Sequence, residues 1–204
     1  MSMAFLITAL LVVASPGTGA IYTVSTSLSH GIRRGLIAAA GCTLGIIPHM
    51  LAAILGLATV FRTSALAFEI LKVIGAAYLL YMAWNALRDA RMLEIKDSGE
   101  MQGPGRVIAS AVLINLLNPK LPVFFLAFLP QFVPANDPSP IANMIALSAV
   151  FMAMTLVVFA LYGSFAALLR AHVLSQPAAL TWMRRSFAAC FALFGIRLLL
   201  SHQR

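Results

Sequence analysis

The sequence predicts an all-α membrane protein with six transmembrane helices, arranged as two inverted three-helix repeats. Composition gives the class, because hydrophobic residues make up 61% of the 204 residues and charged residues only 10%, against about 25% in soluble domains. Length gives the number of helices, since each crossing of the hydrocarbon takes about 20 residues. Two prolines at matching positions in the two halves give the repeat.

Six apolar segments follow one another along the chain, at roughly residues 4–27, 36–60, 66–88, 107–133, 141–169 and 186–201. A short basic turn at 29–35 joins the first two segments. The one substantial polar region is a loop at about 89–106, which glycine and proline close. We therefore expect a single transmembrane domain over 1–204, with halves at roughly 1–90 and 106–204.

Basic residues predict the orientation in the membrane. Nine Lys and Arg residues fall in the first, third and fifth connections, and about three on the opposite side. The positive-inside rule places the more basic side, with the loop at 89–106, in the cytoplasm and both termini in the periplasm. The formal net charge of +8 is scattered over several loops, so it does not indicate a nucleic-acid partner.

The first and fourth helices are expected to break at prolines. Pro16 and Pro119 each lie about a dozen residues into an apolar segment, and the third and sixth segments share a glycine-containing pattern at 73–80 and 193–199. Because each half has three spans, the second half must enter the membrane from the opposite face. This is the arrangement of an inverted repeat in which a discontinuous helix leads each half.

The first break, at Ser15-Pro16-Gly17-Thr18, is a candidate binding site. Pro16 removes a backbone donor, while Gly17 and Gly19 let the backbone leave helical geometry. The carbonyls and N–H groups freed there must be satisfied inside the protein, and the positive end of the following half-helix can bind a carboxylate. Ser15 and Thr18 add hydroxyl groups. The alternative interpretation is a simple kink.

The second break, at Asn118-Pro119-Lys120, carries the sharpest signal. A cation at that depth in a membrane costs several kcal/mol, by disputed estimates from about 2.5 upward. Asn115 lies three residues earlier on the same face of the helix. Lys120 is therefore predicted to pair with an anionic group, either a substrate carboxylate or a protein acid. The alternative is that its side chain extends to an interface.

Three further residues are candidates for proton coupling. Pro48 is expected to kink the second helix and places the imidazole of His49 inside it, where it could relay protons or simply pack. Glu69 and Lys72 have the spacing of a helical ion pair, and Glu69 is either an interfacial partner or a titrating carboxylate.

Cysteines and histidines do not suggest a metal site or a cofactor. Cys42 and Cys190 lie in separate apolar segments and have no CxxC spacing, so we interpret them as small buried hydrophobes. The four histidines are scattered along the chain, at positions 30, 49, 172 and 202. No metal and no cofactor is expected.

At these residues the chain resembles the LysE/RhtB family of bacterial amino-acid exporters. The likeness covers nearly the whole length and rests on motifs at 15–17, 29–35, 71–81, 115–120 and 124–132. The Asn-Pro-Lys motif with its Phe-rich continuation is specific. The resemblance implies an exporter of amino acids or related small metabolites in the bacterial inner membrane, driven by the proton-motive force. Many members read Pro-Gly-Pro at the first motif, whereas Thr18 stands here.

The leading hypothesis is therefore a secondary transporter, an antiporter that exports a small amino-acid-like substrate in exchange for protons. The alternatives are a metal-ion exporter, which would need facing carboxylate or histidine ligands, and a membrane thiol-redox carrier, which would need two cysteines able to meet. An enzyme is not expected. The partners expected are the substrate, protons and the lipid bilayer, and the sequence leaves a homo-oligomer open.

Overall fold

The computed structural model describes residues 2–15, 17–60, 103–118, 120–134 and 137–168, with the backbone alone at 57–60, and ten single residues within 73–84 and 185–196. This part of the chain consists of helices joined by turns and short irregular segments, and it contains no strand. The third and sixth predicted spans lie mostly outside the described residues. The ten single residues, which fall in or beside those spans, are all helical.

The first half opens with two short helices in place of one. Helix α1 (Met3–Ala14) begins under Ser2, whose hydroxyl accepts the Phe5 N–H at 3.2 Å, a normal N-terminal cap. Helix α2 (Thr18–His30) follows, bent by 51° from α1. The two helices occupy the first predicted span, with Pro16 between them outside the described residues.

The prediction of a basic turn over 29–35 is wrong in its length, because Gly31 alone separates the two helices there. Helix α2 continues through His30, and α3 (Ile32–Leu44) begins at once. Gly31 has a φ of +82°, a conformation that glycine adopts without the steric cost a side chain brings. One residue is therefore enough to reverse the chain.

The second predicted span is interrupted earlier than Pro48. Helix α3 ends at Leu44 and α4 (Ile47–Val60) begins after a turn at 45–46. Pro48 thus lies in the first turn of α4, where its missing N–H leaves no helical bond unmade. The turn comes before the proline for that reason.

The second half also opens with a bent pair. Helix α6 (Pro104–Leu116) is followed by α7 (Lys120–Val123), a π-helical turn η2 (Phe124–Phe128) and a 3₁₀ turn η3 (Leu129–Phe132). The bend between α6 and the segment 120–132 is 53°. Helix α8 (Pro140–Leu168) then runs for 29 residues.

Four of the predicted spans can thus be compared with described helices. Two of these, Ile32–Gly56 and Pro140–Leu168, are long and apolar enough to cross a membrane. The number rises to four if each bent pair is counted as one span. These counts concern the described residues only.

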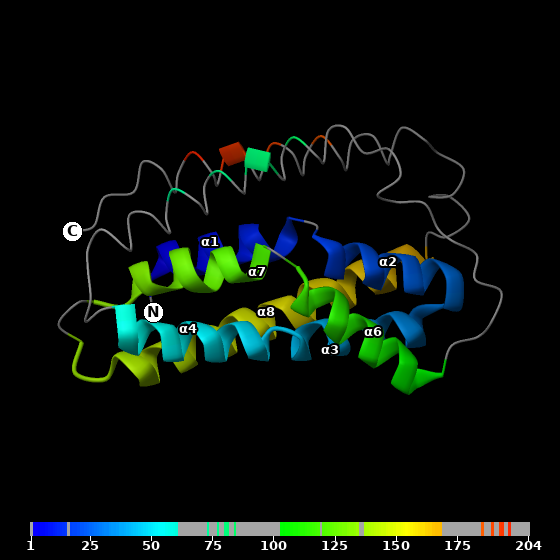
Figure 1. Cartoon of the computed structure of the whole chain (residues 1–204). Helices are drawn as coiled ribbons and strands as arrows, with labels where there is room; N and C mark the ends of the chain where they lie inside the picture. The colour runs from blue at the N-terminus through cyan, green and yellow to red at the C-terminus, as the bar shows by residue number, and fades with distance from the viewer. Residues whose placement is uncertain are drawn as a thin grey trace.

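The bent pairs run antiparallel to each other (Figure 1). Helix α1 lies beside α7 at one end of the molecule, and α2 contacts α6 at the other. Helix α8 contacts α1, α2, α3 and α4 along its length. The two breaks therefore lie near the middle of the molecule and close to each other.

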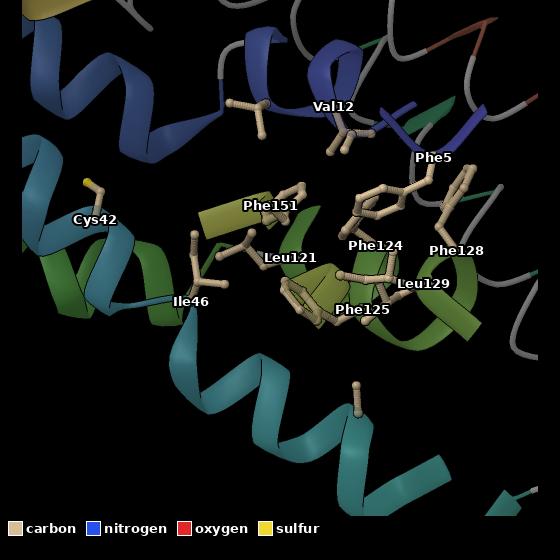
Figure 2. Packing of buried hydrophobic residues seen from close by; sticks show 14 of the residues in the cluster. Phe5, Val12, Cys42, Ile46, Leu121, Phe124, Phe125, Phe128, Leu129 and Phe151 are labelled. Atoms are coloured by element: carbon tan, nitrogen blue, oxygen red, sulfur yellow. The ribbon is translucent and has the colours of Figure 1, made fainter. Parts of the chain in front are cut away.

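The two ends of the molecule are packed differently. Around α7 and η2 the core is aromatic (Figure 2), with the rings of Phe124 and Phe151 stacked at 4.2 Å between centroids. Around α3 and α6 the helices approach through small residues, since a Cβ added to Gly41 would lie 2.7 Å from that of Ala111. The breaks lie between these two zones.

Candidate functional site

The end of α1 leaves a row of backbone carbonyls without helical partners. In a regular helix each carbonyl accepts the N–H four residues later, and Leu11 still does so, from Ser15 at 2.9 Å. For Val12 the residue four positions on is Pro16, which has no N–H. The carbonyls of 13–15 would need amides of α2, which bends away by 51°.

Lys120 binds two of these carbonyls. Its ammonium nitrogen Nζ lies 2.9 Å from the carbonyl oxygen of Val12 and 2.7 Å from that of Ser15. The Ser15 hydroxyl also donates to the Val12 carbonyl, at 2.8 Å. Because the carbonyl end of a helix carries partial negative charge, a cation is favoured there.

Two interpretations of Lys120 from the sequence, a side chain that extends to an interface and a pairing with a protein acid, differ from what the structure shows. The side chain is only 4% exposed, so it does not extend to an interface. The protein acid suggested as its partner is not found among the described residues, where its hydrogen-bond partners are the two carbonyls. These carbonyl partners could not be predicted from the sequence, because every residue has a backbone carbonyl and the prediction considered charged side chains only.

Tyr162 supports the same helix end from α8 and was also missed. Its hydroxyl donates to the carbonyl of Ala14 at 2.7 Å. A signal for it exists in the sequence, since Ser148, Thr155 and Tyr162 recur every seven residues along a mostly apolar helix. That spacing places polar groups on one helical face, which here faces the core.

The second break is organised by two asparagines. The side-chain oxygen of Asn118 accepts the backbone N–H of Lys120 at 3.1 Å, which is an N-terminal cap for α7. The Asn118 amide nitrogen donates to the side-chain oxygen of Asn115 at 3.1 Å. In turn the Asn115 amide nitrogen donates to the carbonyl of Cys42 at 2.5 Å, at the end of α3.

His49 reaches the same break from α4. Its ring nitrogen Nε2 lies 3.2 Å from the carbonyl oxygen of Asn115. A carbonyl oxygen only accepts, so Nε2 must carry the proton in this bond. The residue four positions after Asn115 is Pro119, which has no N–H. The Asn115 carbonyl instead accepts the N–H of Asn118 at 3.1 Å, and His49 is a further donor to it.

Gly17 and Gly19 let α2 approach these groups closely. A Cβ added to Gly17 would lie 3.2 Å from the Asn118 amide nitrogen and 3.3 Å from Lys120 Nζ. A Cβ added to Gly19 would lie 2.6 Å from the side-chain oxygen of Asn115. The start of α2 is thus in direct contact with the second break.

Unused hydrogen-bond donors gather around Gly17. The first amides of a helix have no intrahelical partner, and Gly17 offers no capping side chain to those of α2. An ammonium group has three N–H donors and a carboxamide two. Within the described part of the chain, Lys120 Nζ uses two of its donors and Asn118 one. The arrangement is suited to an anionic group.

Most of the predicted site residues come together. Ser15, Asn115, Asn118 and Lys120 are each at most 4% exposed. Thr18, in contrast, begins α2 with an exposed side chain.

The remaining candidates divide into one described residue and five others. Cys42 is buried, and its thiol lies 3.5 Å from the carbonyl oxygen of Gly19. The predicted roles of Pro16, Pro119, Glu69, Lys72 and Cys190 concern residues outside the described part of the chain.

Comparison with known proteins gives the family. The model for the LysE type translocators matches residues 10–202. A homoserine/homoserine lactone efflux protein of Salmonella typhimurium is 35% identical over 192 residues, which cover 94% of this chain and 92% of the relative. A leucine efflux protein of Klebsiella pneumoniae is 29% identical over 139 residues, which cover 68% of this chain and 66% of the relative. No solved structure matches the chain. The chain therefore belongs to the family of LysE type translocators and is a multi-pass membrane protein.

Proposed function

We propose that the protein is a secondary transporter that exports small amino acids or closely related metabolites, a carrier and not an enzyme. The observation that carries the proposal is the group of unused donors around Gly17, where Lys120, Asn118 and the first amides of α2 converge. The two relatives named above are efflux proteins for homoserine and its lactone and for leucine, which supports an amino-acid substrate.

The first break matches both charges of an amino acid. The carbonyl end of α1 is partially negative and the amide end of α2 is partially positive, and the two ends meet at one bend. In the proposed complex the substrate carboxylate binds the α2 amides, Lys120 and Asn118. The substrate ammonium binds the carbonyls of α1, beside Ser15. In other transporters with broken helices, half-helix N-termini point at the anionic groups of substrates and half-helix C-terminal ends coordinate cations.

We propose that the two halves, roughly 1–90 and 106–204, form the inverted repeat, with six spans and breaks at Pro16 and Pro119. The antiparallel arrangement of the bent pairs and their bends of 51° and 53° support this. Alternating access then follows from rocking of one half against the other around the breaks.

Export is proposed to be driven by the proton-motive force, in exchange for protons across the bacterial inner membrane. The distribution of basic residues supports cytoplasmic placement of the loop at 89–106 and periplasmic termini. His49, Glu69 and Lys72 are the proposed coupling residues. His49 has structural support because it hydrogen-bonds the second break.

Counterflow in proteoliposomes tests the proposal. Purified protein is reconstituted with unlabelled amino acid inside, and uptake of labelled homoserine, leucine, lysine and threonine is measured with and without a proton gradient. We expect uptake of small neutral amino acids, and an outward-directed flux that the gradient accelerates. Absence of counterflow for every amino acid would contradict the proposal.

The alternatives have their own controls in the same assay. Uptake of Zn²⁺ or Mn²⁺ without uptake of any amino acid would identify a metal-ion exporter. Full amino-acid counterflow by a variant without Cys42 and Cys190 would exclude a thiol-redox carrier, since that mechanism needs both cysteines.

A further inference from the structure

Tyr162 contacts the first break from a helix that the substrate site does not otherwise use. Its hydroxyl donates to the carbonyl of Ala14, the last residue of α1, at 2.7 Å. Its ring is stacked with that of Phe159 at 6.5 Å between centroids and 16° between planes. Phe159 in turn packs on Gly19, where an added Cβ would lie 3.2 Å from its ring. Tyr162 thus contacts the α1 side of the bend, and Phe159 contacts the α2 side.

The hydroxyl of Tyr162 compensates for a bond that the bend removes. In a continuous helix the Ala14 carbonyl would accept the N–H of Thr18, four residues later, but Thr18 begins a helix bent by 51°. A buried carbonyl without a donor is unfavourable. The donor comes from α8, so the bond joins the second half of the chain to the first.

Substrate binding changes what holds the end of α1. Lys120 binds the Val12 and Ser15 carbonyls in the structure, and in the proposed function its ammonium also serves the substrate carboxylate. In that proposal the carboxylate competes with the Val12 and Ser15 carbonyls for the Lys120 ammonium group, which weakens the bonds from Lys120 to α1. Tyr162 is then the side chain of the other half, among the described residues, that still binds the last turn of α1.

We propose that Tyr162 is a positioning residue for transport, which holds the carbonyl end of α1 in place while Lys120 engages the substrate. The inference rests on the proposed function, because it assumes a carboxylate substrate at this break. It predicts that loss of the Tyr162 hydroxyl weakens apparent substrate affinity, whereas loss of a comparable hydroxyl outside the break affects stability alone.

The chain offers a matched control in Tyr22. Its hydroxyl donates to the carbonyl of Val107 at 3.3 Å, from α2 to α6, so this bond also joins the two halves. Val107 lies in the first part of α6, away from the bend. Tyr162→Phe and Tyr22→Phe therefore remove the same atom and the same type of bond, one at the break and one outside it.

The test measures KM and maximal rate for labelled homoserine in proteoliposomes, together with the thermal unfolding midpoint of each purified variant. We expect Tyr162→Phe to raise KM roughly tenfold, which is the size of effect that one lost buried hydrogen bond can have. Its midpoint should fall no further than that of Tyr22→Phe, because each variant leaves one carbonyl without the same kind of donor. Tyr22→Phe should keep KM within about twofold, because its bond is remote from the substrate.

Two results would overturn the role of Tyr162: an unchanged KM in Tyr162→Phe, or equal changes in both variants. Either result leaves wild-type transport intact, so the proposed function would stand without it. Failure of the wild type to transport homoserine or any other amino acid would instead contradict the proposed function itself.

Discussion

The two helix breaks are alike at their carbonyl ends and different at their amide ends. Both pairs bend by similar angles, 51° and 53°, and in both a side chain from the other half binds a carbonyl whose fourth following residue is a proline. Lys120 does this for α1 and His49 for α6. At the amide ends, the Asn118 side chain accepts the first N–H of α7, whereas α2 follows Gly17, which has no capping side chain.

For the proposed function, this difference favours one substrate site over two. A capped helix start has already satisfied part of its donors, so the second break has less to offer an anion. The uncapped start of α2 keeps its amides available, and the second break contributes Lys120 and Asn118 to it. The first break thus supplies backbone groups and the second supplies side chains.

Removal of Lys120 tests the comparison most severely. Lys120→Ala is expected to reduce homoserine counterflow below about 1% of wild type, because two hydrogen bonds to a charged group are lost, each worth about 1.5–3 kcal/mol. Protein should still be found in the membrane at a measurable level. Lys120→Arg keeps the charge but not the geometry, and we expect it to recover only part of the rate.

A wild-type rate in Lys120→Ala would remove the residue from the mechanism. The two breaks would then have to act separately, and the comparison would fail.

A methyl group at Gly19 tests whether the breaks must touch. The added Cβ of Gly19→Ala would lie 2.6 Å from the Asn115 side-chain oxygen, so Asn115 must move. Overpacking of this kind costs about 1–3 kcal/mol, and we expect counterflow to fall about tenfold. Gly56→Ala is the matched control, because nothing lies within 4 Å of the Cβ it adds. Equal rates in the two variants would show that the contact has no role.

Changes at Asn118 separate the cap of α7 from substrate binding. Asn118→Ala removes the cap at a cost of about 1 kcal/mol, which should lower the unfolding midpoint by about 2–4 °C. Asn118→Ser can still cap the helix but lacks the amide donor near Gly17. We therefore expect its midpoint to lie above that of Asn118→Ala while its KM for homoserine rises. The assignment of two roles to Asn118 fails if Asn118→Ser retains the wild-type KM.

Changes at His49 should have the smallest effect on counterflow. His49→Ala leaves the Asn115 carbonyl without its side-chain donor, and a typical cost of about 1 kcal/mol corresponds to a rate about fivefold lower. His49→Gln keeps a donor that cannot titrate near neutral pH, so we expect nearly full counterflow. Loss of gradient-driven export in His49→Gln, with counterflow preserved, would assign proton coupling to His49. If His49→Gln retains both counterflow and gradient-driven export, proton coupling must depend on other residues.

Much of the helical framework and part of the site could be predicted from sequence, for identifiable reasons. Hydrophobic runs predicted four helical regions that the structure describes. Proline and lysine within such runs are costly, and this cost is why the sequence singles out Asn118 and Lys120, which the structure places in a buried helix break. The extent of the turn at 29–35 could not be predicted, because a single Gly31 with φ of +82° suffices to reverse the chain.

What sequence could not give were partners that depend on tertiary packing. The carbonyls that bind Lys120 belong to a helix more than 100 residues away in the chain, and no side-chain pattern marks them. Tyr162 and Gly19 acquire their roles only because α8 and α2 pack against the breaks. Thr18 shows the converse, since it was expected to contribute a hydroxyl and its side chain is exposed.

The π-helical turn at 124–128 fixes the rotation of the segment that carries Lys120. A π turn holds one more residue than an α turn, and one residue corresponds to about 100° of rotation about a helix axis. The aromatic rings of η2 are anchored in the core. Deleting one residue from this turn would therefore rotate the lysine by about 100° away from α1, while the hydrophobic composition of the segment stayed almost the same.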